Sequence, residues 1–217
     1  MKYKHIIWDY NGTLLDDVEL CTEIINEMLA KRNLPTMSIE KYRELFDFPV
    51  KEYYKRAGFN FEKESFEKTG TEFIEQYDKR SYKTKLYDGI FELIQKISES
   101  GIRQSILSAR KKEQLHEELK KFEIFKFFDY VFGLNDHYAG GKTETGKQLL
   151  KKINLPRKKI LMIGDTVHDC ETAKILGIDI LPVAYGHHPK QKLLNYKTYI
   201  PENVKEIRDF IFDNIVI

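Results

Sequence analysis

The sequence has few of the features that identify a protein class at once. Only two of its 217 residues are cysteines, Cys21 and Cys170, and they form no CxxC pair. Neither a disulfide framework nor a cysteine zinc site is therefore predicted, and we expect both to be small core residues. No apolar run approaches the roughly 18 residues that span a bilayer, and the start MKYKHIIW is too short for a secretory signal. We expect a cytoplasmic protein with no membrane partner.

An excess of charge of one sign is also lacking. The chain carries 36 Lys and Arg against 34 Asp and Glu, which leaves a formal net charge of +2. Because no long block of like charge occurs, nucleic acid is not a predicted partner. With 217 residues and 41% hydrophobic content, the chain is long enough to bury a full core. One large domain, or a domain with a sizeable insertion, is expected.

The sequence does contain strands that alternate with helices. Short apolar runs predict strands buried on both faces of a sheet. They lie at residues 5–9, 103–108, 129–133, 158–165 and 178–186. Segments of helical period occupy the gaps between the later runs, at residues 88–101, 111–123 and 145–155. This alternation predicts an α/β fold, with a Rossmann-like parallel sheet covered by helices on both faces.

The first strand is followed by a long stretch of helical character. The stretch is interrupted at Pro35, Pro49 and Gly58, which predicts several helices rather than one. Its Tyr and Phe residues are expected to form a core of their own. We therefore predict a helical domain at residues 17–81, inserted into an α/β core made of residues 1–16 and 82–217.

Polar residues stand where several predicted strands end. Asp9 ends the first strand, Ser108 the second and Asp165 the strand that reads ILMIGD, while Lys142 precedes the helix that leads into that strand. The carboxyl ends of parallel strands converge on one crevice, where ligands bind. A carboxylate nucleophile, a hydroxyl, an ammonium and further carboxylates could together hold a divalent cation and a phosphate.

The order of these motifs resembles the haloacid dehalogenase superfamily of phosphohydrolases. The resemblance rests on DxxGT at 9–13, an apolar run ending in Ser108, then Lys142, then GDxxxD at 164–169. It covers nearly the whole chain. A helical insertion directly after the first motif is similar to the branch with an alpha-helical cap, typified by phosphoglycolate phosphatase. The resemblance implies a magnesium-dependent phosphohydrolase that acts on a small phosphorylated metabolite.

The resemblance also implies roles for the residues that bind and attack the phosphoryl group. Asp9 would be the nucleophile that forms an aspartyl-phosphate. Gly12 would permit the tight turn after it, and Thr13 would help to close that loop. Ser108 matches the position whose hydroxyl holds a phosphate oxygen, with assistance from the backbone N–H of Ala109.

The remaining implied roles concern charge and metal. Lys142 matches the lysine that neutralises the nucleophile and the phosphoryl group, with Lys147 as the fallback. Asp165 would bind Mg²⁺, with Asp169 close by as a second ligand or as the group that orients metal-bound water. Asp9 would contribute its carboxylate to the same ion. Taken alone, GDTVHD could be only a strand-to-helix turn capped by Asp165 or Thr166.

Asn11 departs from the family pattern. In most phosphatases of the superfamily this position is a second aspartate, which protonates the leaving group and then activates water. The family's metal contact at this position uses the backbone carbonyl, so magnesium binding by Asn11 should survive the change. Asn11 is also expected at the substrate phosphate. Proton transfer by this residue should not survive, because a carboxamide does not titrate near neutral pH, and a positioned acid or base contributes roughly 100 to 10,000-fold in rate.

Three consequences of Asn11 stay open. The enzyme could act on leaving groups that need no protonation, such as acyl phosphates or phosphoanhydrides. It could draw its acid from His168 or His137. It could instead bind phosphorylated ligands with only vestigial catalysis.

Other chemistry is less compatible with the sequence. A phosphonate-cleaving relative would need a lysine from the helical insertion, for which Lys51 and Lys55 are available. A dehalogenase uses no magnesium, whereas GDTVHD keeps the acidic metal motif. His187 and His188 are expected to form an exposed turn. The identity of the substrate and the oligomeric state stay undetermined at this stage.

Overall fold

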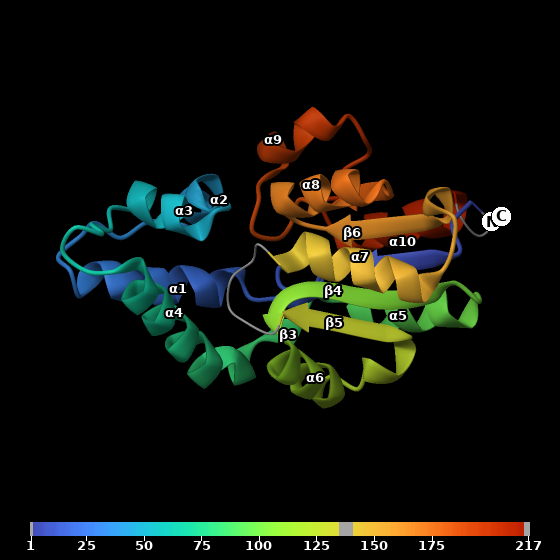
Figure 1. The fold of residues 1–217 in the computed structure, drawn as a ribbon, viewed down its shortest axis with the longest axis horizontal. Helices are drawn as coiled ribbons and strands as arrows, with labels where there is room; N and C mark the ends of the chain where they lie inside the picture. Colours follow the sequence, from blue (N-terminus) through green and yellow to red (C-terminus); the bar gives the residue numbers. More distant parts are fainter. Residues whose placement is uncertain (1, 135–140, 215–217) are drawn as a thin grey trace.

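The computed structural model describes residues 2–134 and 141–214 (Figure 1). Its strands are β1 (His5–Trp8), β2 (Leu15–Asp16), β3 (Lys85–Leu86), β4 (Arg103–Lys111), β5 (Tyr130–Leu134), β6 (Ile160–Gly164) and β7 (Asp179–Pro182). The helices before β4 are α1 (Val18–Ala30), α2 (Ile39–Leu45), α3 (Val50–Ala57), α4 (Phe66–Arg80) and α5 (Ile90–Glu99). Those after it are α6 (Lys112–Lys121), α7 (Lys142–Ile153), α8 (Val167–Leu176), α9 (Lys190–Leu193) and α10 (Val204–Asn214).

Five of these strands form a parallel sheet in the order β5-β4-β1-β6-β7. The chain builds outward from β1 to one side through β4 and β5, and then to the other side through β6 and β7. The strand order therefore reverses at β1, which is where ligands bind in open sheets of this kind. The predicted α/β fold with a parallel sheet is confirmed. The short antiparallel pair of β2 and β3 was not predicted, because two-residue strands carry no periodicity.

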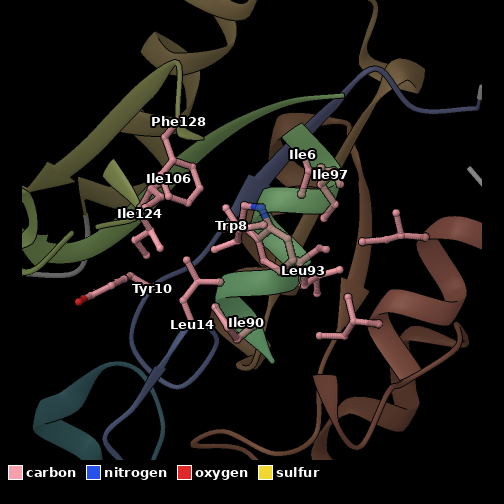
Figure 2. Close-up of a cluster of buried hydrophobic side chains, with 14 of the residues drawn as sticks. Ile6, Trp8, Tyr10, Leu14, Ile90, Leu93, Ile97, Ile106, Ile124 and Phe128 are labelled. Atoms are coloured by element: carbon pink, nitrogen blue, oxygen red, sulfur yellow. The ribbon is translucent and has the colours of Figure 1, made fainter. Parts of the chain in front are cut away.

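Alternation along β1 directs its side chains into two separate cores. Ile6 and Trp8 belong to a cluster with α5, α6 and α10 on one face of the sheet, as Figure 2 shows for their contacts with α5. Ile7 belongs to a second cluster with residues of α7 and α8 on the other face. Since successive strand residues point to opposite faces, the residue at position 9 is directed toward α7 and α8.

Helices α1 to α4 lie between β2 and β3 in the sequence, and in Figure 1 they extend from one end of the sheet. We call residues 17–81 the helical insertion. Its buried tyrosines Tyr42, Tyr53, Tyr54 and Tyr77 pack with apolar residues of α1 in a cluster of their own. The division of the chain into two domains at these boundaries stays a prediction. Among the described helices, none combines the length and apolar character that a membrane crossing requires.

A buried polar network joins the helical insertion to the sheet side of the molecule. His187, in the loop after β7, lies 3.2 Å through Nε2 from Asp17 Oδ1, and its Nδ1 lies 2.9 Å from the hydroxyl of Tyr42 in α2. Tyr77 in α4 donates a hydrogen bond of 2.7 Å to Asp17 Oδ2. The expected exposed turn at His187 and His188 is wrong, since their exposed fractions are 5% and 0%. The contacts of His187 with Asp17 and Tyr42 hold the loop after β7 in the interior.

The Asp17–His187 pair makes stability depend on pH. Burial alone would lower the pKa of His187, but the Asp17 carboxylate raises it to about 9, from an ordinary value of 6.5. The contribution to stability is complete below pH 6.5 and is lost as the pH rises through about 9. We expect the free energy of unfolding to fall by about 3 kcal/mol over this interval. Denaturant titrations at several pH values measure it.

His187→Gln should remove this pH-dependent loss and lower stability at pH 6.5. His116→Gln in α6 is the matched control, and it should retain the wild-type dependence. An identical pH profile in His187→Gln and wild type would show that the pair contributes nothing.

Candidate active site

Two helix N-termini meet the end of β1. Asp9 follows β1 directly, Lys142 is the first residue of α7, and Asp169 lies in the first turn of α8. Lys142 Nζ donates hydrogen bonds to Asp9 Oδ1 and, at 2.5 Å, to Asp169 Oδ1. All three side chains are buried, with exposed fractions of 6% or less. One ammonium thus holds two carboxylates from different elements of the core.

Asp165 joins the cluster from the end of β6. Its Oδ1 accepts a hydrogen bond of 2.9 Å from Thr13 Oγ1, and its Oδ2 accepts one of 2.6 Å from the backbone N–H of His187. Gly12 has a φ of +70°, and a Cβ at that position would collide with the Asp165 carboxylate. The turn after Asp9 therefore requires glycine twice, once for its backbone angle and once for the close approach.

Asp169 is positioned by its own helix as well as by Lys142. Thr166 caps α8, and its N–H and Oγ1 both donate to Asp169 Oδ2, at 3.0 and 2.6 Å. Thr166, rather than Asp165, is therefore the N-cap. The Asp165 side chain is therefore not used as a helix cap. Asp169 uses Oδ2 for the cap, and its Oδ1 accepts the hydrogen bond from Lys142.

Burial and mutual repulsion set the charge states of the carboxylates. Burial, together with the charge of Asp169, raises the pKa of Asp9 well above its ordinary value. Burial also raises the pKa of Asp165, to about 6. Burial would raise the pKa of Asp169 too, but the Lys142 ammonium holds it below its ordinary range. Burial disfavours the charge on Lys142, yet Asp169 and Asp9 raise its pKa, so Lys142 is charged.

The donor set fits a hard divalent cation. Asp9, Asp165 and Asp169 each offer a carboxylate oxygen, and these atoms lie within 4.8 Å of one another. Ionised, the three carboxylates carry two more negative charges than Lys142 balances. Mg²⁺ prefers oxygen ligands and is held by one or two carboxylates together with phosphate. The cluster therefore has both the ligand type and the charge that Mg²⁺ requires.

Ser108, Ala109 and Lys147 were also expected at or near the site, and none of them is hydrogen-bonded to the carboxylate cluster among the residues that the structure describes. Ser108 is 1% exposed in β4, beside β1, and its Oγ accepts a hydrogen bond of 3.0 Å from the N–H of Arg110. Ala109 follows it in the same strand. Within the described residues, no hydrogen bond joins the Ser108 hydroxyl to the carboxylate cluster. Lys147 is exposed and pairs with Glu144 at 2.5 Å, away from the cluster.

The Asn11 side chain is hydrogen-bonded to residues of the helical insertion. Its Nδ2 donates hydrogen bonds of 2.8 Å to Asp17 Oδ2 and to the Tyr77 hydroxyl. Both partners accept from it, whereas an aspartate could donate to at most one of them, and only in its protonated form. Asp17 also accepts from the N–H of Gly12, at 2.9 Å. Asn11 is thus hydrogen-bonded to the carboxylate of Asp17, six positions later in the sequence.

Of His168 and His137, the two histidines expected as an alternative acid, the structure describes His168. His168 is half-buried in the first turn of α8, and its ring packs 4.7 Å from that of Phe48 in the helical insertion. His137 lies outside the described residues. For the phosphonate alternative, Lys51 is exposed with its ammonium 6.0 Å from the Phe61 ring, and Lys55 pairs with Glu52 at 2.8 Å.

The sequence reasoning missed the pairing of Asp17 with His187. An acidic residue just before a helix is usually explained by the positive end of the helix dipole. Asp17 does precede α1, but its side chain makes no capping hydrogen bond. Nothing local in either segment signals the pairing, because the two residues are 170 positions apart and meet only through the fold.

Comparisons with known proteins agree with this arrangement. A family model described as haloacid dehalogenase-like hydrolase matches residues 6–183. A candidate pyrophosphatase, PpaX, from Caldanaerobacter subterraneus is 27% identical over 207 residues, which cover 91% of this chain and 89% of that protein. Phosphoglycolate phosphatase 1 from Pseudomonas aeruginosa is 22% identical, over 93% of this chain and 77% of its own length.

Solved structures show the same fold. The crystal structure of a candidate phosphatase from Clostridium difficile superposes with a TM-score of 0.78 and 27% identity, over 97% of this chain and 99% of that one. The matched segment of the family model begins in β1 and ends just after β7, so it includes Asp9, Lys142, Asp165 and Asp169. The chain belongs to the haloacid dehalogenase-like hydrolase family.

Proposed function

We propose that the protein is a Mg²⁺-dependent phosphohydrolase of small phosphorylated metabolites, with Asp9 as its nucleophile. The observation that carries the proposal is the buried contact of Lys142 with both Asp9 and Asp169, beside Asp165. A lysine so placed can balance a nucleophilic carboxylate and an incoming phosphoryl group. The phosphatase names among the relatives support the same reaction class.

In the proposed reaction a carboxylate oxygen of Asp9 attacks phosphorus, and the bond from phosphorus to the leaving-group oxygen breaks. The product is an aspartyl-phosphate, which water then hydrolyses to phosphate and free Asp9. Lys142 offsets the negative charge that gathers on the phosphoryl oxygens, and Asp165 and Asp169, with Asp9, would hold Mg²⁺. When bound, the ion supplies charge stabilisation for the transferring group. Ser108 and the Ala109 N–H would hold a phosphate oxygen.

The helical insertion is proposed to act as a cap. Asp9 is only 6% exposed, so a substrate can reach it only if the insertion moves away from the core. Phe46 of the insertion packs 5.2 Å from the ring of His187, and Arg43 donates at 3.2 Å to the His188 carbonyl. Closure of these contacts over a bound phosphate would exclude bulk water during phosphoryl transfer.

The position of Asn11 favours substrates with good leaving groups. Its amide is held by two acceptors and offers no proton to an alkoxide. We therefore propose acyl phosphates or phosphoanhydrides as the preferred class, in keeping with the pyrophosphatase name of one relative. A protein that binds phosphorylated ligands with vestigial turnover is the competing function, and the positions of Lys51 and Lys55 do not favour a phosphonate reaction.

Phosphate release from acetyl phosphate, pyrophosphate and phosphoglycolate, with and without Mg²⁺, tests the proposed activity. We expect release from at least one substrate, dependent on Mg²⁺ and abolished by Asp9→Asn, because no other described group replaces the nucleophile. Lys142→Ala should abolish release as well. Lys147→Ala is its matched control and should retain full activity. No release from any substrate, together with thermal stabilisation by them, would favour the binding function.

Asn11→Asp tests the assignment of leaving groups. A carboxyl group here can donate a proton, and a positioned acid contributes roughly 100 to 10,000-fold. We expect the ratio of kcat/KM for phosphoglycolate to that for acetyl phosphate to rise at least about tenfold. The variant should also be less stable, since the new carboxyl group faces Asp17. An unchanged ratio would mean that another group already protonates the leaving group.

Mg²⁺ binding should weaken at low pH. The pKa of Asp165 is raised to about 6 by burial, so a proton competes with the ion for this carboxylate below that pH. Calorimetry should show an affinity at least about tenfold lower at pH 5 than at pH 7.5. Asp165→Asn should bind weakly at both values. Asp88→Asn, at an exposed site, should behave as wild type, and a pH-independent affinity in wild type would contradict the assignment.

A further inference from the structure

A second group of metal-ligating side chains lies apart from the carboxylate cluster. Asp17, Cys21 and His187 are all buried, and one ligand atom from each lies within 4.8 Å of the others. Asp17 and Cys21 are four positions apart at the start of α1, so they share one face of that helix. His187 comes from the loop after β7. From this geometry we propose a binding site for a thiophilic divalent cation such as Zn²⁺, formed by Asp17, Cys21 and His187.

The separations are close to those of zinc coordination. Zinc bonds of about 2.1 Å to nitrogen or oxygen and about 2.3 Å to sulfur place neighbouring ligand atoms about 3.4 to 3.6 Å apart. One carboxylate oxygen of Asp17, Oδ1, lies 3.2 Å from His187 Nε2, and the other, Oδ2, lies 3.8 Å from Cys21 Sγ, so a small rotation of the carboxylate would bring one oxygen to both. A mixed carboxylate, thiolate and imidazole set suits zinc, whereas the all-oxygen cluster around Asp9 suits Mg²⁺.

The ligand set would neutralise a dication. A carboxylate from Asp17 and a thiolate from Cys21 carry two negative charges, and a neutral His187 imidazole adds none. A bound dication would therefore leave no unbalanced charge in a dry environment.

Outer partners already orient the ligands. The second ring nitrogen of His187 faces the Tyr42 hydroxyl, and Asp17 accepts from Tyr77 and Asn11. Metal-binding histidines and carboxylates are usually held in this way through their remaining polar atoms. The proposed ion would therefore bind to side chains that are fixed in place by their neighbours.

An unpaired hydroxyl lies in the same buried cluster as the thiol. Tyr53 in α3 is 1% exposed, and its hydroxyl has no hydrogen-bond partner within the described part of the chain. Tyr53 and Cys21 both belong to the core of the helical insertion. Buried polar groups are rarely left unpaired except where an ion or a water molecule belongs.

Titration with Co²⁺ tests the site in the intact 217-residue chain, because cobalt bound by a thiolate gives a near-ultraviolet charge-transfer band that oxygen ligands do not give. Excess Mg²⁺ occupies the carboxylate cluster during the titration. We expect the band in wild type and in Asp9→Asn, its loss in Cys21→Ser, and its retention in Cys170→Ser. Cys170 is the matched control, since it is also buried.

Zn²⁺ calorimetry gives an independent readout. Cys21→Ser should weaken binding by more than the roughly 10 to 100-fold that follows loss of an outer partner, and circular dichroism checks that the variant is folded. His187→Gln supplies a second ligand deletion with the same expected loss. Absence of the band in wild type, or its persistence in Cys21→Ser, would overturn the proposal. Neither outcome bears on phosphate release, which depends on Asp9.

Discussion

The contact of one lysine ammonium with two buried carboxylates determines how the candidate active site is assembled. Asp9 ends the central strand, Asp169 begins α8, and Lys142 begins α7, so a single cation fixes the start of two helices against β1. Removing one partner of such a buried group leaves an uncompensated charge, at a cost of several kcal/mol. The cluster is therefore electrostatically stable only as a unit. That explains why residues far apart in the sequence must converge here.

The sequence predicts the parts of the molecule that have local signals. Continuous apolar runs such as 160–164 and the helical period of 90–97 predict the sheet and its covering helices, because burial on both faces leaves that pattern. Asp9 and Asp165 could be predicted as neighbours because the carboxyl ends of parallel strands share one edge. The place of Lys142 before the helix that leads to Asp165 put it nearby, and the family resemblance implied Asp169. The prediction of a cytoplasmic location rests on absences alone, and the structure does not test it.

The remaining features depend on contacts that no local pattern records. The burial of His187 follows from Asp17 and Tyr42, which come from other elements. The hydrogen bonds of Asn11 likewise depend on Tyr77, in the last helix of the insertion. Asp17 accepts a hydrogen bond from Asn11 and also pairs with His187. The burial of His187 and the hydrogen bonds of Asn11 therefore depend on the same carboxylate. An amide can donate to a buried carboxylate without itself titrating near neutral pH.

The short pairing of β2 with β3 has a mechanical consequence. Both connections between the helical insertion and the core pass through these two strands, so under the proposed cap movement the insertion would turn about them. The rings of Phe46 and Phe48, in the α2–α3 connection, contact those of His187 and His168. Opening would have to separate these aromatic contacts, whereas the backbone pairing of β2 with β3 could persist.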